Sequence, residues 1–184
     1  MDRDSFDRLM TEHLPAAHRL AIRLCGDPDR AEELAQEAML RASRGWDGFR
    51  AQARFTTWLF QIVINVFRDQ LRRKRTAGVH EDVNELIEDD SVPAPHAAMS
   101  GSELGELVAK YVSSLPPRQR EVLVLVAYEQ MSPSQAASVL GISEQNARTN
   151  LHHARQTLKR HLAAYLGEEP PAKGCCEDRR RSTI

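Results

Sequence analysis

Five polar side chains recur every three or four residues within FTTWLFQIVINVFRDQLRRKR, residues 55–75. A helix would place them along one side, as a polar stripe made of Gln61, Asn65, Arg68, Arg72 and Arg75. Amide side chains read base edges and guanidinium groups bind phosphates, so the chemistry this stripe could perform is nucleic-acid binding. Trp58 and Asp69 border the stripe, and a tryptophan there could stack on an unpaired base.

A simpler interpretation of the stripe stays open at this point. Any surface helix needs a polar side, and arginines near a helix C-terminus complement the helix dipole. Trp58 would then be a half-buried core residue, which is the commoner fate of a single tryptophan. Against this interpretation, Asp69 is the one acid that could neutralise the stripe, so its arginines pair poorly within the helix.

The elements that must position the stripe are also helical. Apolar residues of segment 55–75 cover most of the remaining circumference: Leu59, Ile62, Val63 and Val66, with Phe60, Ile64, Phe67 and Leu71 beside them. Two earlier amphipathic patterns run from Phe6 to Leu24 and from Asp29 to Ser43, separated by Gly26-Asp27-Pro28. The segment Gly45-Trp46-Asp47-Gly48 predicts a loop before the stripe helix.

A second set of polar side chains lies near the C-terminus, in a helix-turn-helix pattern. Ser132 to Gln135 has capping-box spacing with Pro at the first helical position, Gly141 ends that helix, and Ser143 caps the next. The last helix has one apolar face: Ala147, Leu151, Ala154, Leu158 and Leu162 or Tyr165. Its other sides carry Gln145, Thr149, His153, Gln156 and Arg160, flanked by Arg148, His152, Arg155 and Lys159. Such a helix suits the DNA major groove, with its first turns at base edges and its later basic residues at phosphates.

These patterns predict an all-α protein of two small helical domains joined by a flexible acidic linker. We call residues 1–76 the N-terminal block and residues 103–167 the C-terminal block. The linker, residues 77–102, contains EDVNELIEDD with six acids and leaves room for a short helix near 84–88. The tail, residues 168–184, has a disorder-prone composition.

Composition argues against several other classes of protein. The first residues, MDRDSFDRLM, lack the apolar stretch of a signal peptide, and no run is long enough to span a bilayer. Cys25, Cys175 and Cys176 form no disulfide framework, so we expect a cytoplasmic location without membrane insertion. Adjacent His152 and His153 would point about 100° apart on a helix and could not chelate one metal together. Since no catalytic or phosphate-binding signature occurs, we expect no enzyme activity, cofactor, metal or small-molecule substrate.

Three motifs together resemble the extracytoplasmic-function (ECF) sigma factors, the smallest class of bacterial RNA polymerase specificity subunit. They are DRAEELAQEAMLRA (29–42), the stripe segment (55–75), and LPPRQREVLVLV with GISEQNARTNLHHAR (115–155). The resemblance implies that the N-terminal block is sigma region 2, which binds core polymerase and recognises and melts the −10 element. The C-terminal block would be region 4, which recognises the −35 element, and the partners would be core RNA polymerase, promoter DNA and an anti-sigma factor.

The resemblance also implies roles for single residues. Polymerase contacts would fall to Glu33, Gln36, Glu37 and Arg41. The loop from Gly45 to Arg54 would hold an extruded base, with Asn65, Arg68 and Asp69 beside it and Arg72, Arg73 and Arg75 on the strand backbone. The stripe pattern adds Trp58 and Gln61 to these −10 contacts. The −35 contacts implied by the resemblance are Arg148, Thr149, His152 and His153, and the helix pattern adds Gln145 and Arg155.

Two rival functions fit part of the sequence. A one-domain helix-turn-helix regulator explains residues 103–165 but gives the polar stripe no task. An RNA-binding helical protein would use the stripe but needs no recognition helix. Affinity for core RNA polymerase separates a sigma factor from both.

Overall fold

The structure, a computed structural model, describes residues 3–49, 54–76 and 101–166. Every regular element among these residues is a helix, which confirms the predicted all-α class. The expected tail, nearly all of the expected linker and the short helix near 84–88 lie outside the described residues. No helix of the described part is both long and apolar enough to cross a membrane.

The N-terminal block is built from three helices: α1 (Arg3–Cys25), α2 (Pro28–Gly45) and α3 (Phe55–Thr76). The predicted break between the first two is present, since Gly26 takes a left-handed conformation with φ of 68°. Asp27 then caps α2 by accepting a hydrogen bond of 2.8 Å from the Arg30 amide, and Pro28 follows at the first helical position. The three helices pack on one another, so α3 is supported by both of the others.

The segment after α2 is more ordered than the predicted loop, because Trp46–Gly48 forms a 3₁₀ turn. Trp46 is buried, and its ring lies 5.4 Å from that of Phe49 and 5.2 Å from that of Phe6. Burying this large ring fixes the turn more firmly than the glycines on either side would suggest. Residues 50–53 of the expected base-binding loop lie outside the described residues.

The C-terminal block contains α4 (Gly101–Ser114), α5 (Pro117–Leu123), η2 (Val124–Tyr128), α6 (Pro133–Leu140) and α7 (Glu144–Leu166). The helix-turn-helix pattern is confirmed in α6 and α7. Ser132 and Gln135 form both hydrogen bonds of a capping box at the start of α6, and Gly141 ends it with φ of 66°. The Ser143 hydroxyl accepts a hydrogen bond of 3.2 Å from the Asn146 amide at the start of α7.

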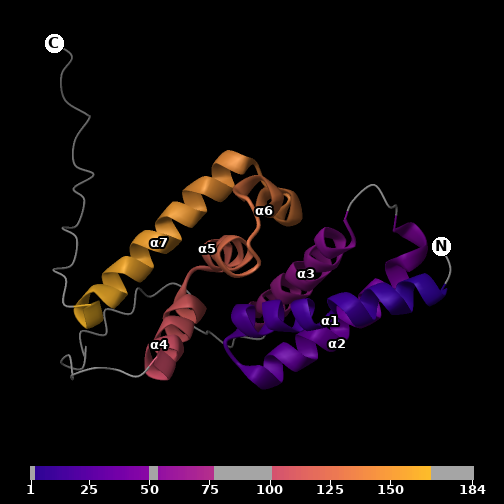
Figure 1. Ribbon diagram of the computed structural model, residues 1–184, viewed down its shortest axis with the longest axis horizontal. Coiled ribbons are helices and arrows are strands. Elements are labelled where there is room, and N and C mark those ends of the chain that lie inside the picture. The colour runs from indigo at the N-terminus through magenta and orange to yellow at the C-terminus, as the bar shows by residue number, and fades with distance from the viewer. Residues whose placement is uncertain (1–2, 50–53, 77–100, 167–184) are drawn as a thin grey trace, which may run out of the picture.

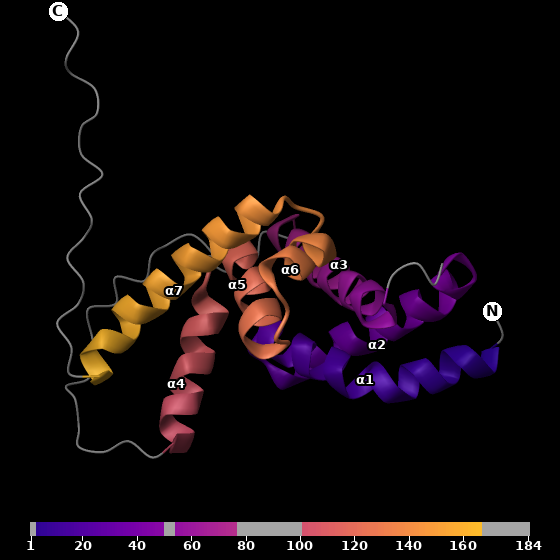
Figure 2. The same ribbon diagram turned by 45° about the horizontal axis from the view of Figure 1, so that its top comes forward.

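The helix that begins with α5 does not continue as a regular α-helix, because η2 is a π-helical turn. Four successive residues, 122–125, are buried there. An α-helix with one apolar face cannot bury four in a row, but α5 and η2 lie between α7 on one side and the N-terminal block on the other. Figures 1 and 2 both show this intermediate position.

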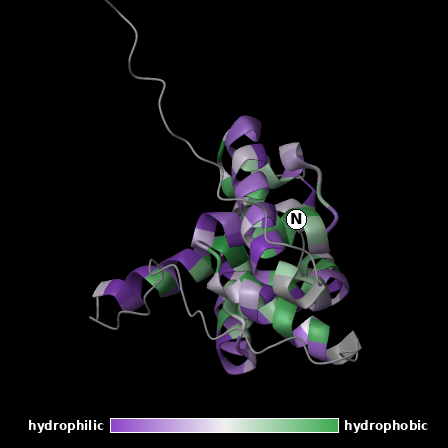
Figure 3. Cartoon of the chain, turned by 90° about the vertical axis from the view of Figure 1, so that its left-hand side faces the viewer, coloured by the Kyte–Doolittle hydropathy of each residue, from purple (hydrophilic) through white to green (hydrophobic). Residues whose placement is uncertain are grey.

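The two blocks share one continuous cluster of buried apolar side chains instead of two separate cores. Helices α1 and α3 contact α4, η2 and α6 across what we call the interblock interface. Hydrophobic and hydrophilic residues alternate along the helices in Figure 3, as expected when amphipathic helices pack with their apolar faces inward.

Candidate nucleic-acid interface

The exposed side of α7 carries all six residues predicted to contact the −35 element. Ala147, Leu151 and Ala154 are buried against α5 and α6, which fixes the orientation of the helix. The residues on its outer side are all exposed: Gln145, Arg148, Thr149, His152, His153 and Arg155. Leu158 and Leu162 continue the inner face as half-buried residues, whereas the side chain of Tyr165 lies outside the described residues.

Several of these α7 side chains bond within their own helix. Arg148 donates to Glu144 Oε1 through Nη2 at 2.5 Å and through Nε at 3.0 Å. Thr149 donates its hydroxyl to the carbonyl of Gln145 at 3.0 Å. An exposed ion pair one helical turn apart is worth only a few tenths of a kcal/mol, roughly 0.3–0.5. Arg148 can therefore exchange Glu144 for a DNA phosphate or base at little cost.

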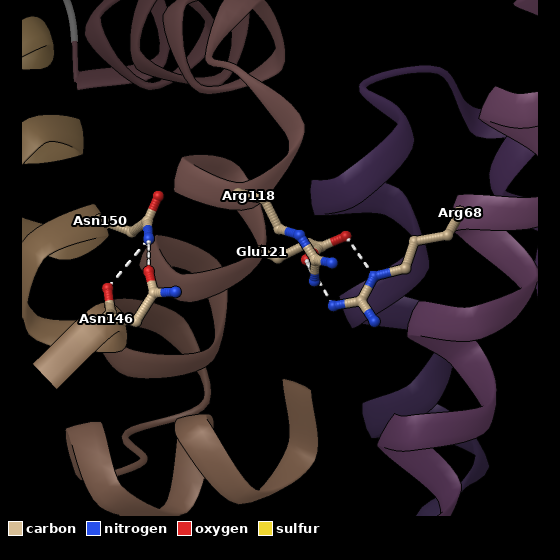
Figure 4. Close-up of polar contacts among 5 residues, drawn as sticks. All are labelled: Arg68, Arg118, Glu121, Asn146 and Asn150. Atoms are coloured by element: carbon tan, nitrogen blue, oxygen red, sulfur yellow. Dashed lines mark hydrogen bonds and ion pairs between the residues drawn. The ribbon is translucent and has the colours of Figure 1, made fainter. Parts of the chain in front are cut away.

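Asn146 and Asn150 form a second pair on α7, shown in Figure 4. Asn150 Nδ2 donates to the side-chain oxygen of Asn146 at 2.5 Å and to its backbone oxygen at 2.9 Å. Sequence reasoning did not select this pair. The spacing of four residues between two asparagines was the available signal.

The polar stripe lies on α3 opposite its buried side, but it is not uniformly exposed. Leu59, Val63 and Val66 are almost fully buried. Within the stripe, Asn65, Arg72 and Arg75 are exposed, whereas Gln61 and Arg68 are half-buried, as are Trp58 and Asp69 beside it.

Trp58 is part of an aromatic cluster at the start of α3. Its ring centre lies 4.9 Å from that of Phe49, 5.5 Å from that of Phe55 and 6.4 Å from that of Trp46. This packing agrees with the half-buried position considered above, and it holds the 3₁₀ turn against α3. Trp46 and Phe49 lie within the loop predicted to hold an extruded base, but neither was singled out as a site residue. Their place in an aromatic-rich stretch before the stripe was the signal that could have found them.

The predicted polymerase-binding residues lie on α2, next to the stripe. Arg41 donates to Glu37 through Nε at 2.7 Å and to Asp69 of α3 through Nη1 at 2.7 Å. The hydrogen bond from Arg41 lowers the pKa of Asp69 and raises that of Arg41. Asp69 also lies 3.5 Å from Arg72, so this carboxylate joins the two predicted surfaces.

The other predicted polymerase contacts, Glu33 and Gln36, are exposed on α2. Met39 and Leu40 are exposed beside them, Leu40 to 52%. Contiguous exposed apolar patches mark protein-binding surfaces, and these two neighbouring side chains would add apolar area to such a surface. They were missed in the sequence, although both fall outside the buried pattern of Leu34, Ala38 and Ala42.

The C-terminal block contacts the polar stripe at two residues, Arg68 and Gln61. Arg68 bonds to both carboxylate oxygens of Glu121 in α5, through Nε at 2.9 Å and through Nη2 at 2.7 Å (Figure 4). Gln61 donates from Nε2 to the backbone oxygen of Ser138 in α6 at 3.1 Å. Asp69 is therefore not the only carboxylate that neutralises the stripe, because folding brings Glu121 to it.

Comparison with known proteins matches each block to a protein family. The family model of sigma-70 region 2 matches residues 9–77, and that of sigma-70 region 4 matches residues 105–158. The ECF RNA polymerase sigma factor SigM of Mycobacterium tuberculosis is 33% identical over 165 residues, which cover 90% of this chain and 80% of the relative. The chain belongs to the ECF RNA polymerase sigma factors.

Two other similar proteins are a longer sigma factor and a sigma factor solved with a bound partner. SigE of Mycolicibacterium smegmatis is 32% identical over 167 residues, but the present sigma factor spans only 64% of that relative. The solved structure of the sigma factor RpoE with the anti-sigma factor NepR, from Bartonella quintana, matches with a TM-score of 0.69 and 28% identity. That match covers 86% of the present chain and 96% of RpoE. The sigma factor accordingly acts in transcription initiation, through binding of core RNA polymerase and recognition of promoter DNA.

Proposed function

We propose that this sigma factor recognises the −35 element through the exposed side of α7 and opens the −10 element through the polar stripe of α3. The observation that carries the proposal is the exposure of all six predicted −35 residues on the second helix of a helix-turn-helix. Arg148, Thr149 and His152 lie in the first half of α7, where a recognition helix meets base edges. Arg155 is one turn further along and is placed to bind phosphate.

At the −10 element, the proposed roles follow from exposure and chemistry. Asn65 offers an exposed amide to an unpaired base, and Arg72 and Arg75 offer exposed guanidinium groups to the strand. Flipping one base out of a duplex costs a few kcal/mol, so these contacts together must offset that cost. Trp58 supports this surface from the aromatic cluster, and Arg68 and Asp69 lie beside it.

Core polymerase binding is assigned to α2, through Glu33, Gln36, Glu37 and Arg41, with Met39 and Leu40 as additional apolar contacts. The boundaries of the two functional units, residues 1–76 and 103–167, form part of the same proposal. The sigma factor would act in the cytoplasm, where its polymerase works, and would have no catalytic activity of its own. Because RpoE binds an anti-sigma factor, we also propose such a partner for this chain.

Two variants separate the proposed functions in one experiment. Arg148→Ala should weaken promoter binding by the polymerase holoenzyme by about 1–3 kcal/mol, since a base or phosphate contact is lost. Asn65→Ala should leave polymerase and promoter binding in place but reduce reactivity of the −10 thymines toward permanganate. The matched control is Arg8→Ala, which removes an exposed arginine of α1 that has no assigned role.

The assignment of −35 recognition to α7 and the assignment of DNA opening to the stripe can each be contradicted separately. If holoenzymes with Arg148→Ala and with Arg8→Ala bind the promoter with equal affinity, α7 does not recognise the −35 element. If the −10 thymines keep full permanganate reactivity with Asn65→Ala, the stripe does not take part in DNA opening.

A further inference from the structure

The asparagine pair near the start of α7 has a polar edge that the six assigned −35 contacts do not use. Asn150 donates from Nδ2 to the side-chain oxygen of Asn146 at 2.5 Å and to its backbone oxygen at 2.9 Å. In Figure 4 the amino nitrogen of Asn146 points away from Asn150. The contacts of the described residues leave this amino group without a protein partner. It is therefore available to a ligand.

The backbone under the pair is held in place from two directions. The Asn146 amide donates to the hydroxyl of Ser143 at 3.2 Å, which caps the helix. The residues that follow each asparagine, Ala147 and Leu151, are buried against the rest of the C-terminal block. Asn146 itself is exposed and Asn150 is half-buried. The pair thus lies at the edge of the buried face, with Asn146 on the solvent side.

Asn146 lies on a side of α7 that is already assigned to DNA. His153, one of the predicted −35 contacts, follows it by seven residues, which is about two helical turns, so both side chains leave the helix in nearly the same direction. Arg148 and Asn146 stand on either side of buried Ala147 and point to opposite sides of the helix. A helix in the major groove has base edges within reach on both sides. Asn146 is therefore placed at the same depth as Arg148, on the other side.

The side-chain chemistry of Asn146 selects among the four bases. Adenine presents an acceptor, N7, and a donor, the N6 amino group, in the major groove, and an asparagine amide binds both at once. The Oδ1 atom of Asn146 accepts one hydrogen bond from Asn150, and a carbonyl oxygen can accept two. Oδ1 can therefore still accept from N6 while Nδ2 donates to N7.

Asn150 determines which end of the Asn146 amide carries the oxygen. If the amide turned over, the amino group of Asn146 would face the amino group of Asn150, donor against donor. A turned amide would present its amino group where adenine has a donor and where guanine has the acceptor O6. The hydrogen bond from Asn150 therefore holds the orientation that fits adenine and disfavours the one that fits guanine.

We propose that Asn146 reads an adenine of the −35 element through its side-chain amide, and that Asn150 is a positioning residue that fixes the orientation of this amide. This role rests on the proposed assignment of α7 to the −35 element, and it adds a specificity-determining residue to that surface. A bidentate contact of this kind discriminates against the wrong base by roughly 5- to 150-fold.

The first test selects DNA from a duplex library with a randomised −35 region, using holoenzyme made of core polymerase and the full-length chain. The parent should enrich adenine, on one strand or the other, at a position where Asn146→Ala loses the preference while the other positions keep theirs. Asn150→Ala should accept guanine as well as adenine at this same position. A pair that only stabilised the helix would weaken binding at all positions equally. Arg8→Ala, which removes an exposed side chain of α1, is the control and should select the parent sequence.

The second test changes the DNA and therefore does not depend on the folding of a variant. The selected adenine is replaced by 7-deazaadenine, which lacks the N7 acceptor but keeps the N6 amino group and its base pairing. Parent holoenzyme should bind the modified duplex more weakly than the unmodified one. Holoenzyme with Asn146→Ala should bind the two duplexes equally, since the coupling between the amide and N7 is absent. Equal binding of both duplexes by the parent would overturn the adenine contact.

The selection also separates failure of this role from failure of the −35 assignment. If Arg148→Ala changes the selected sequence and Asn146→Ala does not, α7 reads the −35 element without Asn146. If Asn150→Ala selects adenine as strictly as the parent, the positioning role of Asn150 is wrong. If the parent selects no −35 sequence at all, the assignment of α7 is wrong and the role of Asn146 is wrong with it.

Discussion

Arg68 binds the Glu121 carboxylate in the structure, and the proposed function gives it a second partner, a DNA strand. Its planar group suits both, because carboxylates and phosphates present the same pair of oxygens. A lysine at position 68 would keep the charge but lose the paired geometry. The same guanidinium group is therefore suited to either partner.

Glu129 predicts a pH dependence of stability. Its side chain is only 9% exposed, and burial raises its pKa, with smaller opposing effects from Arg23 and Arg19. A raised pKa means that the folded chain binds this proton more tightly than the unfolded chain. The associated stability is complete below the ordinary glutamate pKa of about 4.3 and is lost as pH rises through the higher folded value.

Glu129→Gln should remove this dependence, since the amide does not titrate and can still accept a hydrogen bond from Arg23. Between pH 4 and 7, the thermal midpoint of the variant should fall less, or rise more, than that of the parent chain. Glu106→Gln serves as the control because it removes an exposed carboxylate. Parallel pH curves for Glu129→Gln and the parent would contradict the burial argument.

At the scale of elements, the turn between α6 and α7 depends on one left-handed residue. Gly141 has φ of 66°, and nothing lies within 4 Å of the place where a Cβ would be. Gly141→Ala should therefore cost about 1–2 kcal/mol of unfolding free energy from backbone strain alone. Gly141→Asn should cost less, since asparagine tolerates this conformation better.

Gly105 is the matched control for this prediction. It lies inside α4 and also has nothing within 4 Å of an added Cβ. Gly105→Ala should stabilise the chain by roughly 0.5–1 kcal/mol, because alanine is the better helix former. Denaturant unfolding of the two variants should give opposite signs, and equal signs would show that the conformation of Gly141 is not what matters.

Local sequence signals were sufficient for most elements of the fold. Gly26 with Asp27, and Ser132 with Gln135, marked helix ends because caps act within a few residues. The π turn of η2 was not predictable, because it depends on burial of residues 122–125 from two sides. The exposed side of α7 could be predicted from its apolar face.

At the scale of the whole molecule, the interblock interface could not be predicted. Arg68 and Glu121 are 53 residues apart, and a basic stripe could pair with many acids of this chain, including those of the acidic segment 81–90. Only the folded arrangement selects Glu121. Candidate residues of the two binding surfaces could be named from the sequence, while the contact between the two blocks required the structure.

A sigma factor with these two DNA-binding surfaces should direct RNA polymerase to promoters and open the DNA at defined sites. The decisive experiment is transcription of fragmented genomic DNA by purified core polymerase, with transcript 5′ ends mapped with and without the chain. We expect new start sites that share one −35 and one −10 sequence, that are lost with Arg148→Ala, and that are retained with Arg8→Ala. A pattern of start sites identical to that of core polymerase alone would show that the chain does not direct polymerase to promoters.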